Sequence, residues 1–187
     1  ITATRTDELV GLLRDHPYDV LLMPYGSAFP VDAWPAIHAF LASGGGLVVL
    51  GGAPFHEPII GGGPKWVHGT RSPSFAHELA IGPAEALKMT DGSTTYALTL
   101  RLGSKTKDFP NEHGSAAHRD AVARSLATVL DASRTPRGCA LLEVDHVDGP
   151  SAGARWLLAT TDKAHDAAAI KRMLERALEG AGDTRAI

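Results

Sequence analysis

Two short apolar runs, VLLM (Val20–Met23) and LVVL (Leu47–Leu50), decide how this chain folds. The first lies within YDVLLMP (Tyr18–Pro24) and the second within GGGLVVLGG (Gly44–Gly52). Apolar residues are continuous rather than alternating in both runs, which is typical of strands buried on both faces of a parallel sheet. We therefore predict strands over residues 18–24 and 47–50.

A helix is predicted between these two strands. Asp32 is a suitable cap, Pro35 fits the first turn, and Gly44–Gly46 ends the helix. Its apolar face follows the helical spacing through Trp34, Ile37, His38 and Leu41. Strand, helix and strand then form a βαβ unit with a right-handed crossover. Ligand sites in such sheets lie beyond the carboxyl ends of the strands, here at residues 24–29 and 51–56.

The rest of the chain continues the mixture of helices and strands. We predict helices over residues 4–14, 74–79, 117–130 and 162–179, a strand over 94–102, a loop over 103–114, and a hairpin of strands 138–146 and 154–161. Residues 61–92 are rich in Gly, Pro, Ser and His and give no clear pattern beyond the short helix. With no internal repeat and no low-complexity linker, residues 1–187 are predicted to form a single domain.

The composition is that of an ordinary globular protein and excludes some partners. Of the 187 residues, 44% are hydrophobic and 21% are charged, and the net charge is −3. No dense basic cluster is present, which argues against nucleic acid as a partner, and no apolar run is long enough to cross a bilayer. We therefore predict no nucleic-acid partner and no membrane partner.

The first strand, its turn and the glycine-ended helix before the second strand resemble the class I glutamine amidotransferase-like superfamily. The likeness covers Tyr18–Gly26 and Phe40–Pro54. The turn sequences Pro24–Pro30 and Gly51–Phe55 further resemble non-catalytic amidotransferase-like domains of large bacterial glycosidases of the β-galactosidase type. The resemblance implies a three-layer, flavodoxin-like α/β fold: a mostly parallel sheet with helices on both faces, here with an added antiparallel hairpin.

Active members of this superfamily carry a cysteine nucleophile in the sharp turn, or elbow, after the second strand. The matching positions here are Gly51, Gly52, Ala53 and Pro54, and none of them has a nucleophilic side chain. Cys139 is the single cysteine of the chain and lies far from this turn in the sequence. We therefore expect a degenerate elbow and no catalytic residue. A small ligand cleft is predicted at the strand ends, lined by Tyr25, Gly26, Ser27, Phe55, His56 and Glu57.

A second hypothesis is a stand-alone hydrolase that uses Ser27 or acidic residues at the strand ends. No Gly-x-Ser-x-Gly elbow surrounds Ser27, so a turn serine is favoured. His56 and Glu57 lack a following histidine at zinc-binding spacing. Glycoside hydrolysis needs a pair of carboxyl groups about 5–10 Å apart. No spacing in the sequence pairs any two of the candidates Asp32, Glu57, Glu78 and Asp108.

Two further patterns suggest ligands only weakly. Gly61–Lys65 lacks the spacing of a phosphate-binding loop. A polar cluster in the 103–120 region is more typical of a solvated loop than of a metal site; its members are Glu112, His113, His118 and Asp120. We predict no cofactor and no metal.

The sequence thus favours a non-catalytic accessory, scaffold or oligomerisation domain of a larger carbohydrate-active, glycoside hydrolase-like protein. The first residue is Ile1 rather than Met, and we expect a piece excised from a longer bacterial chain. The expected partners are other domains of that chain, a second copy of the domain, or a carbohydrate. The location, cytoplasmic or exported, would follow that of the parent chain.

Overall fold

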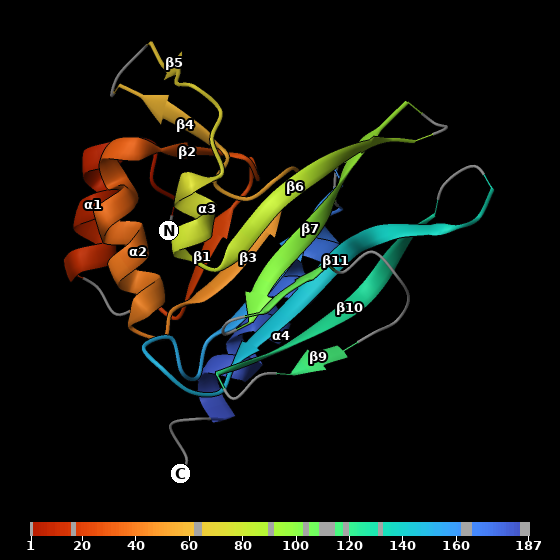
Figure 1. The fold of residues 1–187 in the computed structure, drawn as a ribbon. Helices are drawn as coiled ribbons and strands as arrows, with labels where there is room; N and C mark the ends of the chain where they lie inside the picture. The colour runs from red at the N-terminus through yellow and green to blue at the C-terminus, as the bar shows by residue number, and fades with distance from the viewer. Residues whose placement is uncertain are drawn as a thin grey trace.

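The computed structural model describes residues 2–15, 18–61, 65–89, 92–102, 105–108, 115–117, 120–130, 133–161 and 166–183. Sheet A forms its centre, with strands in the order β1-β3-β12-β11-β10-β9 (Figure 1). Their bounds are β1 Val20–Met23, β3 Gly46–Leu50, β9 Ser115–Ala117, β10 Ala121–Leu130, β11 Pro136–His146 and β12 Arg155–Ala159. The chain therefore has an α/β fold built on one large sheet.

Sheet A is mixed rather than mostly parallel, so that part of the expected architecture is wrong. β3 pairs in parallel with β1 on one side and with β12 on the other. Beyond β12 every pairing is antiparallel, through β11 and β10 to β9. The antiparallel half arises because short connections between neighbouring strands leave no room for crossover helices.

Helices cover both faces of the parallel half of sheet A. Helix α4 (Ala167–Asp183) packs on one face, against β12 and β3. On the other face lie helices α1 (Thr6–Asp15) and α2 (Trp34–Ala42), with α2 preceded by the 3-10 turn η1 (Val31–Ala33). Figure 1 shows α1 as the outermost of these helices.

Two smaller sheets complete the fold. Sheet B joins β2 (Ala28–Pro30), β4 (Glu57–Ile60) and β5 (Val67–His68). Sheet C is the antiparallel ribbon of β6 (Ile81–Lys88), β7 (Thr94–Leu102) and β8 (Lys105–Asp108), which follows helix α3 (Ser74–Glu78). β7 packs against β11, so the long ribbon in Figure 1 lies over the antiparallel half of sheet A.

The core is divided by the alternation of side chains along the central strands. On β3, Leu47 and Val49 face α1, α2 and sheet C, whereas Val48 and Leu50 face α4. All five residues of β3 are buried, which confirms the expected strand with two covered faces. Complete burial of each such aliphatic side chain stabilises the fold by about 1.5–3 kcal/mol.

Most of the predicted elements are confirmed with small shifts at their ends. These are the helices at residues 4–14 and 74–79, the helix after Asp32, the strands at 18–24, 47–50 and 94–102, and the hairpin, which is β11 and β12. The unclear stretch 61–92 contains β5 and β6 in addition to α3. The predicted loop 103–114 contains β8, and its residues 103–104 and 109–114 lie outside the described part of the chain.

The predicted helix over residues 117–130 is wrong, because this segment forms the end of β9 and all of β10. Ala121 and Ala123 are buried on one face, while Val122 and Arg124 lie on the other, which is the period of a strand. Its apolar residues also fit a helical spacing, so the sequence pattern was ambiguous. Pairing along most of β11 decides the outcome, from Ala121 opposite His146 to Leu130 opposite Pro136.

The predicted helix 162–179 begins and ends later than expected. The Asp166 carboxylate accepts a hydrogen bond from the backbone N–H of Ala169 (2.6 Å), which starts α4 at Ala167. The helix continues through Gly180 to Asp183. A Cβ at position 180 would lie 2.3 Å from the Cβ of Arg155, so this glycine permits close packing of α4 on β12. No described helix combines the length and the apolarity required to cross a membrane.

His146 ends β11 and contacts Trp156, with ring centroids 4.0 Å apart. Its Nε2 is buried and has no hydrogen-bond partner within the described residues. Burial lowers the pKa of His146 to about 4, against the opposing effect of the Asp145 charge. The folded state therefore favours the neutral imidazole.

We predict that His146 makes the fold sensitive to acid. A lowered pKa stabilises the fold fully above the unfolded value of about 6.5, and this contribution is lost as the pH falls from there to about 4. The loss amounts to about 3 kcal/mol, and His146→Phe should remove it. Urea unfolding at several pH values checks this, with exposed His68→Gln as control. Parallel pH profiles for wild type and His146→Phe would contradict it.

Candidate functional site

The carboxyl ends of β1 and β3 meet in the structure, and their turns are in direct backbone contact. Gly26, after β1, has a φ of +45°, and Gly51, after β3, has a φ of +79°. A Cβ on Gly26 would lie 1.1 Å from the carbonyl oxygen of Gly51. Only glycine fits at this contact, so position 26 is fixed by the approach of the two turns.

Ser27 joins the two turns by hydrogen bonds. Its Oγ accepts a hydrogen bond from the backbone N–H of Ala53 (2.8 Å), and its carbonyl oxygen accepts one from the N–H of Glu57 (2.9 Å). The side chain is only 8% exposed. A Cβ on Gly52 would lie 2.3 Å from the Ser27 Oγ, which shows how closely the elbow wraps this hydroxyl. The role of Ser27 seen here is to hold the elbow in place.

The elbow itself keeps a tight backbone and turns its side chains inward. Gly52 has a φ of +78°, and Phe55 has a φ of +58°, which is strained for an aromatic residue. Ala53 and Phe55 are fully buried. The Phe55 ring packs edge-on against Phe29 (5.6 Å between centroids) and Trp34 (5.3 Å). Burial of this ring offsets the backbone strain, so Phe55 belongs to the core rather than to a cleft wall.

His56 is also turned into the protein, with 5% of its surface exposed. Its Nδ1 lies 2.7 Å from the carbonyl oxygen of Pro54, so Nδ1 carries the proton and donates to that oxygen. Nε2 is then an acceptor, buried and without a hydrogen-bond partner in the described part of the chain. Burial, helped by the charges of Arg71 and His77, lowers the pKa of His56 and keeps the ring neutral.

Two of the turn residues, Tyr25 and Glu57, have exposed or half-exposed side chains. Tyr25 is 81% exposed. The Glu57 carboxylate lies 3.8 Å from the Arg71 guanidinium, and that guanidinium lies over the Tyr96 ring (5.4 Å to the centroid). Of the six residues expected to line a cleft, Tyr25 and Glu57 therefore reach the surface, while Gly26, Ser27, Phe55 and His56 are buried. A cleft of about 640 Å³ lies elsewhere, beside α1.

The other candidate residues do not assemble into a site here. The Glu78 carboxylate accepts a hydrogen bond from the Trp34 indole N–H (2.7 Å), and Asp32 lies at the α1 cleft. Gly62–Pro64, Glu112, His113 and His118 lie outside the described residues, as does the side chain of Asp108. Within the described chain, no three His, Cys, Asp or Glu side chains are placed to hold a metal ion.

Cys139 lies on β11, two strands away from β3. Its thiol is buried and donates to the carbonyl oxygen of Leu141 (2.9 Å). Burial raises the pKa of the Cys139 thiol, which disfavours the nucleophilic thiolate. The thiol therefore does not replace the missing elbow nucleophile.

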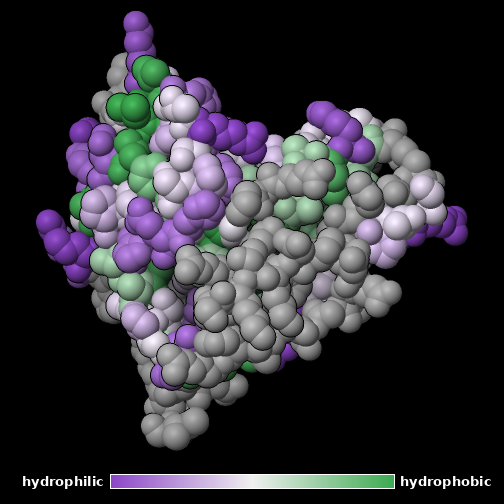
Figure 2. Space-filling model, viewed as in Figure 1, coloured by the Kyte–Doolittle hydropathy of each residue, from purple (hydrophilic) through white to green (hydrophobic). Residues whose placement is uncertain are grey.

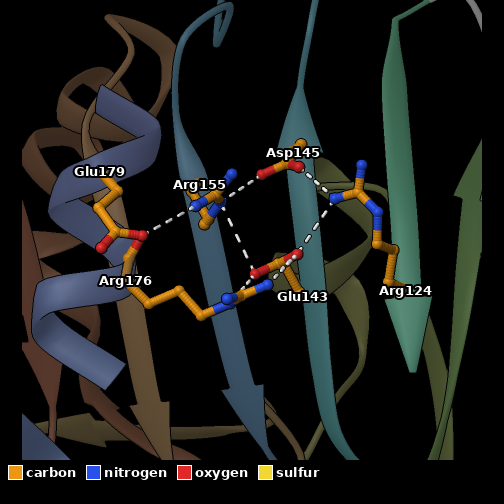
Figure 3. Close-up of polar contacts among 6 residues, drawn as sticks. All are labelled: Arg124, Glu143, Asp145, Arg155, Arg176 and Glu179. Carbon is orange, nitrogen blue, oxygen red and sulfur yellow. Dashed lines mark hydrogen bonds and ion pairs between the residues drawn. The ribbon is translucent and has the colours of Figure 1, made fainter. Parts of the chain in front are cut away.

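A buried charge cluster on the α4 side of sheet A was not foreseen from the sequence (Figure 3). Glu143 on β11 is fully buried, and its carboxylate binds Arg124 of β10 (3.1 Å) and Arg176 of α4 (3.1 Å). Asp145 binds Arg155 of β12 (2.5 Å) and also Arg124. Cations from three elements thus surround two carboxylates of one strand.

The cluster fixes the charge of its members. Burial alone would raise the pKa of Asp145, but hydrogen bonds from Arg155 and Arg124 outweigh it and lower that pKa. The hydrogen bond to Glu143 raises the pKa of Arg176. One signal in the sequence could have found this cluster: Glu143 and Asp145 alternate with the apolar Leu142 and Val144 in a strand pattern. A carboxylate on a face that a helix covers requires a cation.

Comparisons with protein-family models, with curated proteins and with solved structures give no match for this chain. The geometry of the strand ends therefore carries the functional argument.

We predict that Ser27→Ala destabilises the fold by about 1–3 kcal/mol, because the buried N–H of Ala53 loses its acceptor. Urea unfolding measures this change. The matched control is Ser43→Ala, at the exposed end of α2, where water can replace the lost hydrogen bond to the carbonyl oxygen of Phe40. Equal small losses in the two variants would show that the Ser27 hydroxyl does not hold the elbow.

We further predict that Glu143→Gln destabilises the fold by about 1.5–3 kcal/mol, because it weakens the charge-assisted hydrogen bonds from Arg124 and Arg176 to a buried carboxylate. Glu175→Gln is the control, since Glu175 forms only an exposed pair with Lys171 on α4. The free energy of unfolding in urea is the measurement. A loss below about 1 kcal/mol, the range of exposed pairs, would contradict the structural role.

Proposed function

We propose that this chain is a non-catalytic, amidotransferase-like module that serves as a scaffold, accessory or oligomerisation domain of a larger protein. The observation that carries the proposal is the hydrogen bond from the Ala53 N–H to the Ser27 Oγ. It commits the buried hydroxyl at the strand ends to a structural contact. The elbow residues Gly51–Pro54 have no nucleophilic atom of their own.

The relationship to flavodoxin-like amidotransferase domains is part of this proposal. It is supported by the parallel pair β1 and β3 around α2, by the positive φ angles of the elbow, and by helices on both faces of the parallel strands. The antiparallel strands β9, β10 and β11 are the departure from a mostly parallel sheet. They extend the sheet beyond β12.

The carbohydrate-active context rests on the resemblance of the turns at Pro24–Pro30 and Gly51–Phe55 to bacterial glycosidase-associated domains. The exposed Tyr25 ring offers an aromatic face of the kind that sugars contact. In this role the parent protein would supply the chemistry, and this domain would supply position or assembly.

A hydrolase using Ser27 is less well supported by the geometry. An attacking hydroxyl needs a base within hydrogen-bond reach and access to substrate. The Ser27 Oγ is buried and accepts a hydrogen bond from the backbone, and the candidate base His56 donates its Nδ1–H to Pro54. Of the candidate acids, Glu57 pairs with Arg71 and Glu78 bonds Trp34.

We predict that the folded chain has no glutaminase, amidase or glycosidase turnover above background. The measurement is product release from glutamine, from anilide amides and from nitrophenyl glycosides. At protein concentrations of about 10 μM, even a kcat far below those of ordinary enzymes is detectable. Turnover that disappears in His56→Gln or Glu57→Gln, both still folded by circular dichroism, would overturn the proposal. Lys171→Gln on α4 is the control for preparation artefacts.

A further inference from the structure

Helix α1 presents a stripe of four residues to the outside of the molecule. Asp7, Val10, Gly11 and Arg14 follow the spacing i, i+3, i+4, i+7, which places them on one helix face. All four line the cleft of about 640 Å³, together with Arg5, Thr6, Asp32 and Gly61. We call these four residues the α1 stripe. The opposite side of α1 is anchored to the core through Leu9 and Leu13, and Val10 is half-buried, packing partly against the core and partly lining the cleft.

Gly11 is not required by the fold of a single copy. A Cβ at this position would meet nothing within 4 Å, and the residue has no positive φ. A glycine in the middle of a helix nevertheless lowers helix stability relative to alanine. The bare backbone at Gly11 thus leaves room for the close approach of something from outside the molecule.

The α1 stripe is complementary to itself when it is reversed. If a second stripe runs antiparallel across a twofold axis between Val10 and Gly11, each Val10 faces the Gly11 of the other copy. The same operation places each Asp7 opposite the other Arg14. A twofold contact needs this property, because each residue of one copy must suit its counterpart in the other.

We propose that a second copy of this chain docks α1 against α1 in this antiparallel arrangement. The Val10 side chains fill the spaces left by Gly11, and Asp7 and Arg14 form ion pairs between copies. This inference rests on the proposed assembly role and names its partner and surface. The intrachain pairs Arg5–Asp7 and Arg14–Asp15 are exposed, and such pairs hold their side chains weakly, so exchange of partners costs little.

The β4–β5 hairpin supplies apolar surface at the edge of this contact. The Thr6 hydroxyl approaches the carbonyl oxygen of Gly61, directly after β4 (3.5 Å). On either side of Gly61 the hairpin carries three exposed apolar side chains: Ile60, Trp66 and Val67. Figure 2 shows hydrophobic side chains gathered over this part of the molecule. Two helices of ten residues bury little area alone, so the hairpin enlarges the interface toward the size that a specific dimer needs.

The test measures molecular mass by sedimentation velocity from about 2 to about 200 μM, the range in which a small interface associates. The wild-type chain is expected to shift from monomer to dimer. Gly11→Gln should remain monomeric because its side chain fills the contact. Gly11→Ala should weaken association less than Gly11→Gln, because its methyl group takes only part of the space that Val10 of the other copy fills, and it raises helix stability.

Charge reversal identifies the geometry. Asp7→Arg and Arg14→Asp should each weaken association at least about tenfold, because each places like charges opposite one another. Mixing these two variants should restore a dimer, since a copy with two arginines then faces a copy with two aspartates. The double variant Asp7→Arg/Arg14→Asp should also dimerise. Lys171→Glu, on the exposed side of α4, is the control and should behave as wild type.

A wild-type chain that stays monomeric throughout this range would overturn the proposal. So would a dimer that persists in Gly11→Gln and in both single charge variants, because the contact would then lie elsewhere. Neither result bears on the absence of turnover, which the assays of hydrolysis decide separately. The antiparallel twofold arrangement is supported specifically if Asp7→Arg and Arg14→Asp are each monomeric alone and form a dimer when they are mixed.

Discussion

The burial of β3 on both faces and both edges is the constraint on which the rest of the structure depends. Its backbone pairs with β1 and β12, so no edge remains for solvent. Leu47 and Val49 require a cover on one side, and Val48 and Leu50 require a cover on the other. Helices α2 and α4 meet these two requirements, and α2 also returns the chain to the sheet at β3. The layered arrangement follows from one strand that cannot be exposed.

The same strand fixes the position of the elbow. Gly51 leaves β3 with a positive φ and touches the turn after β1, since β1 and β3 are neighbours in register. Ser27 then closes the contact by accepting the N–H of Ala53. A turn held in this way is rigid, yet its side chains are hydrogen or methyl groups, or are directed into the core. The turn after β3, where the expected family carries its nucleophile, here serves to hold the ends of β1 and β3 together.

The α4 face shows a different balance of forces. A fully buried carboxylate such as Glu143 is costly unless cations and hydrogen bonds compensate it. Arg176 belongs to α4 and pairs with Glu143 of β11, so the cluster links this helix to β11. Apolar packing of Met173 and Ala177 stabilises the contact between α4 and sheet A. The ion pair between Arg176 and Glu143 restricts the position of the helix on the sheet. The cluster is therefore best understood as structural.

The sequence alone determined the elements whose signals are local. Continuous apolar runs gave β1 and β3, strict alternation gave β7, and the turn at Asp148–Pro150 gave the β11–β12 hairpin. The absence of a nucleophile at Gly51–Pro54 was also a property of the sequence, because no fold can add a missing atom. These features depend on residues within a few positions of one another.

Tertiary structure decided the features that depend on distant partners. The segment 121–130 has a pattern that suits either a helix or a strand, and pairing with β11 selected the strand. Phe55 and His56 follow β3 in a position that suits a cleft, but packing against Phe29 and Trp34 and the bond to Pro54 turned both inward. Burial and pairing are properties of the assembled chain. For that reason the strand-end turns were predictable, and the closing of the expected cleft was not.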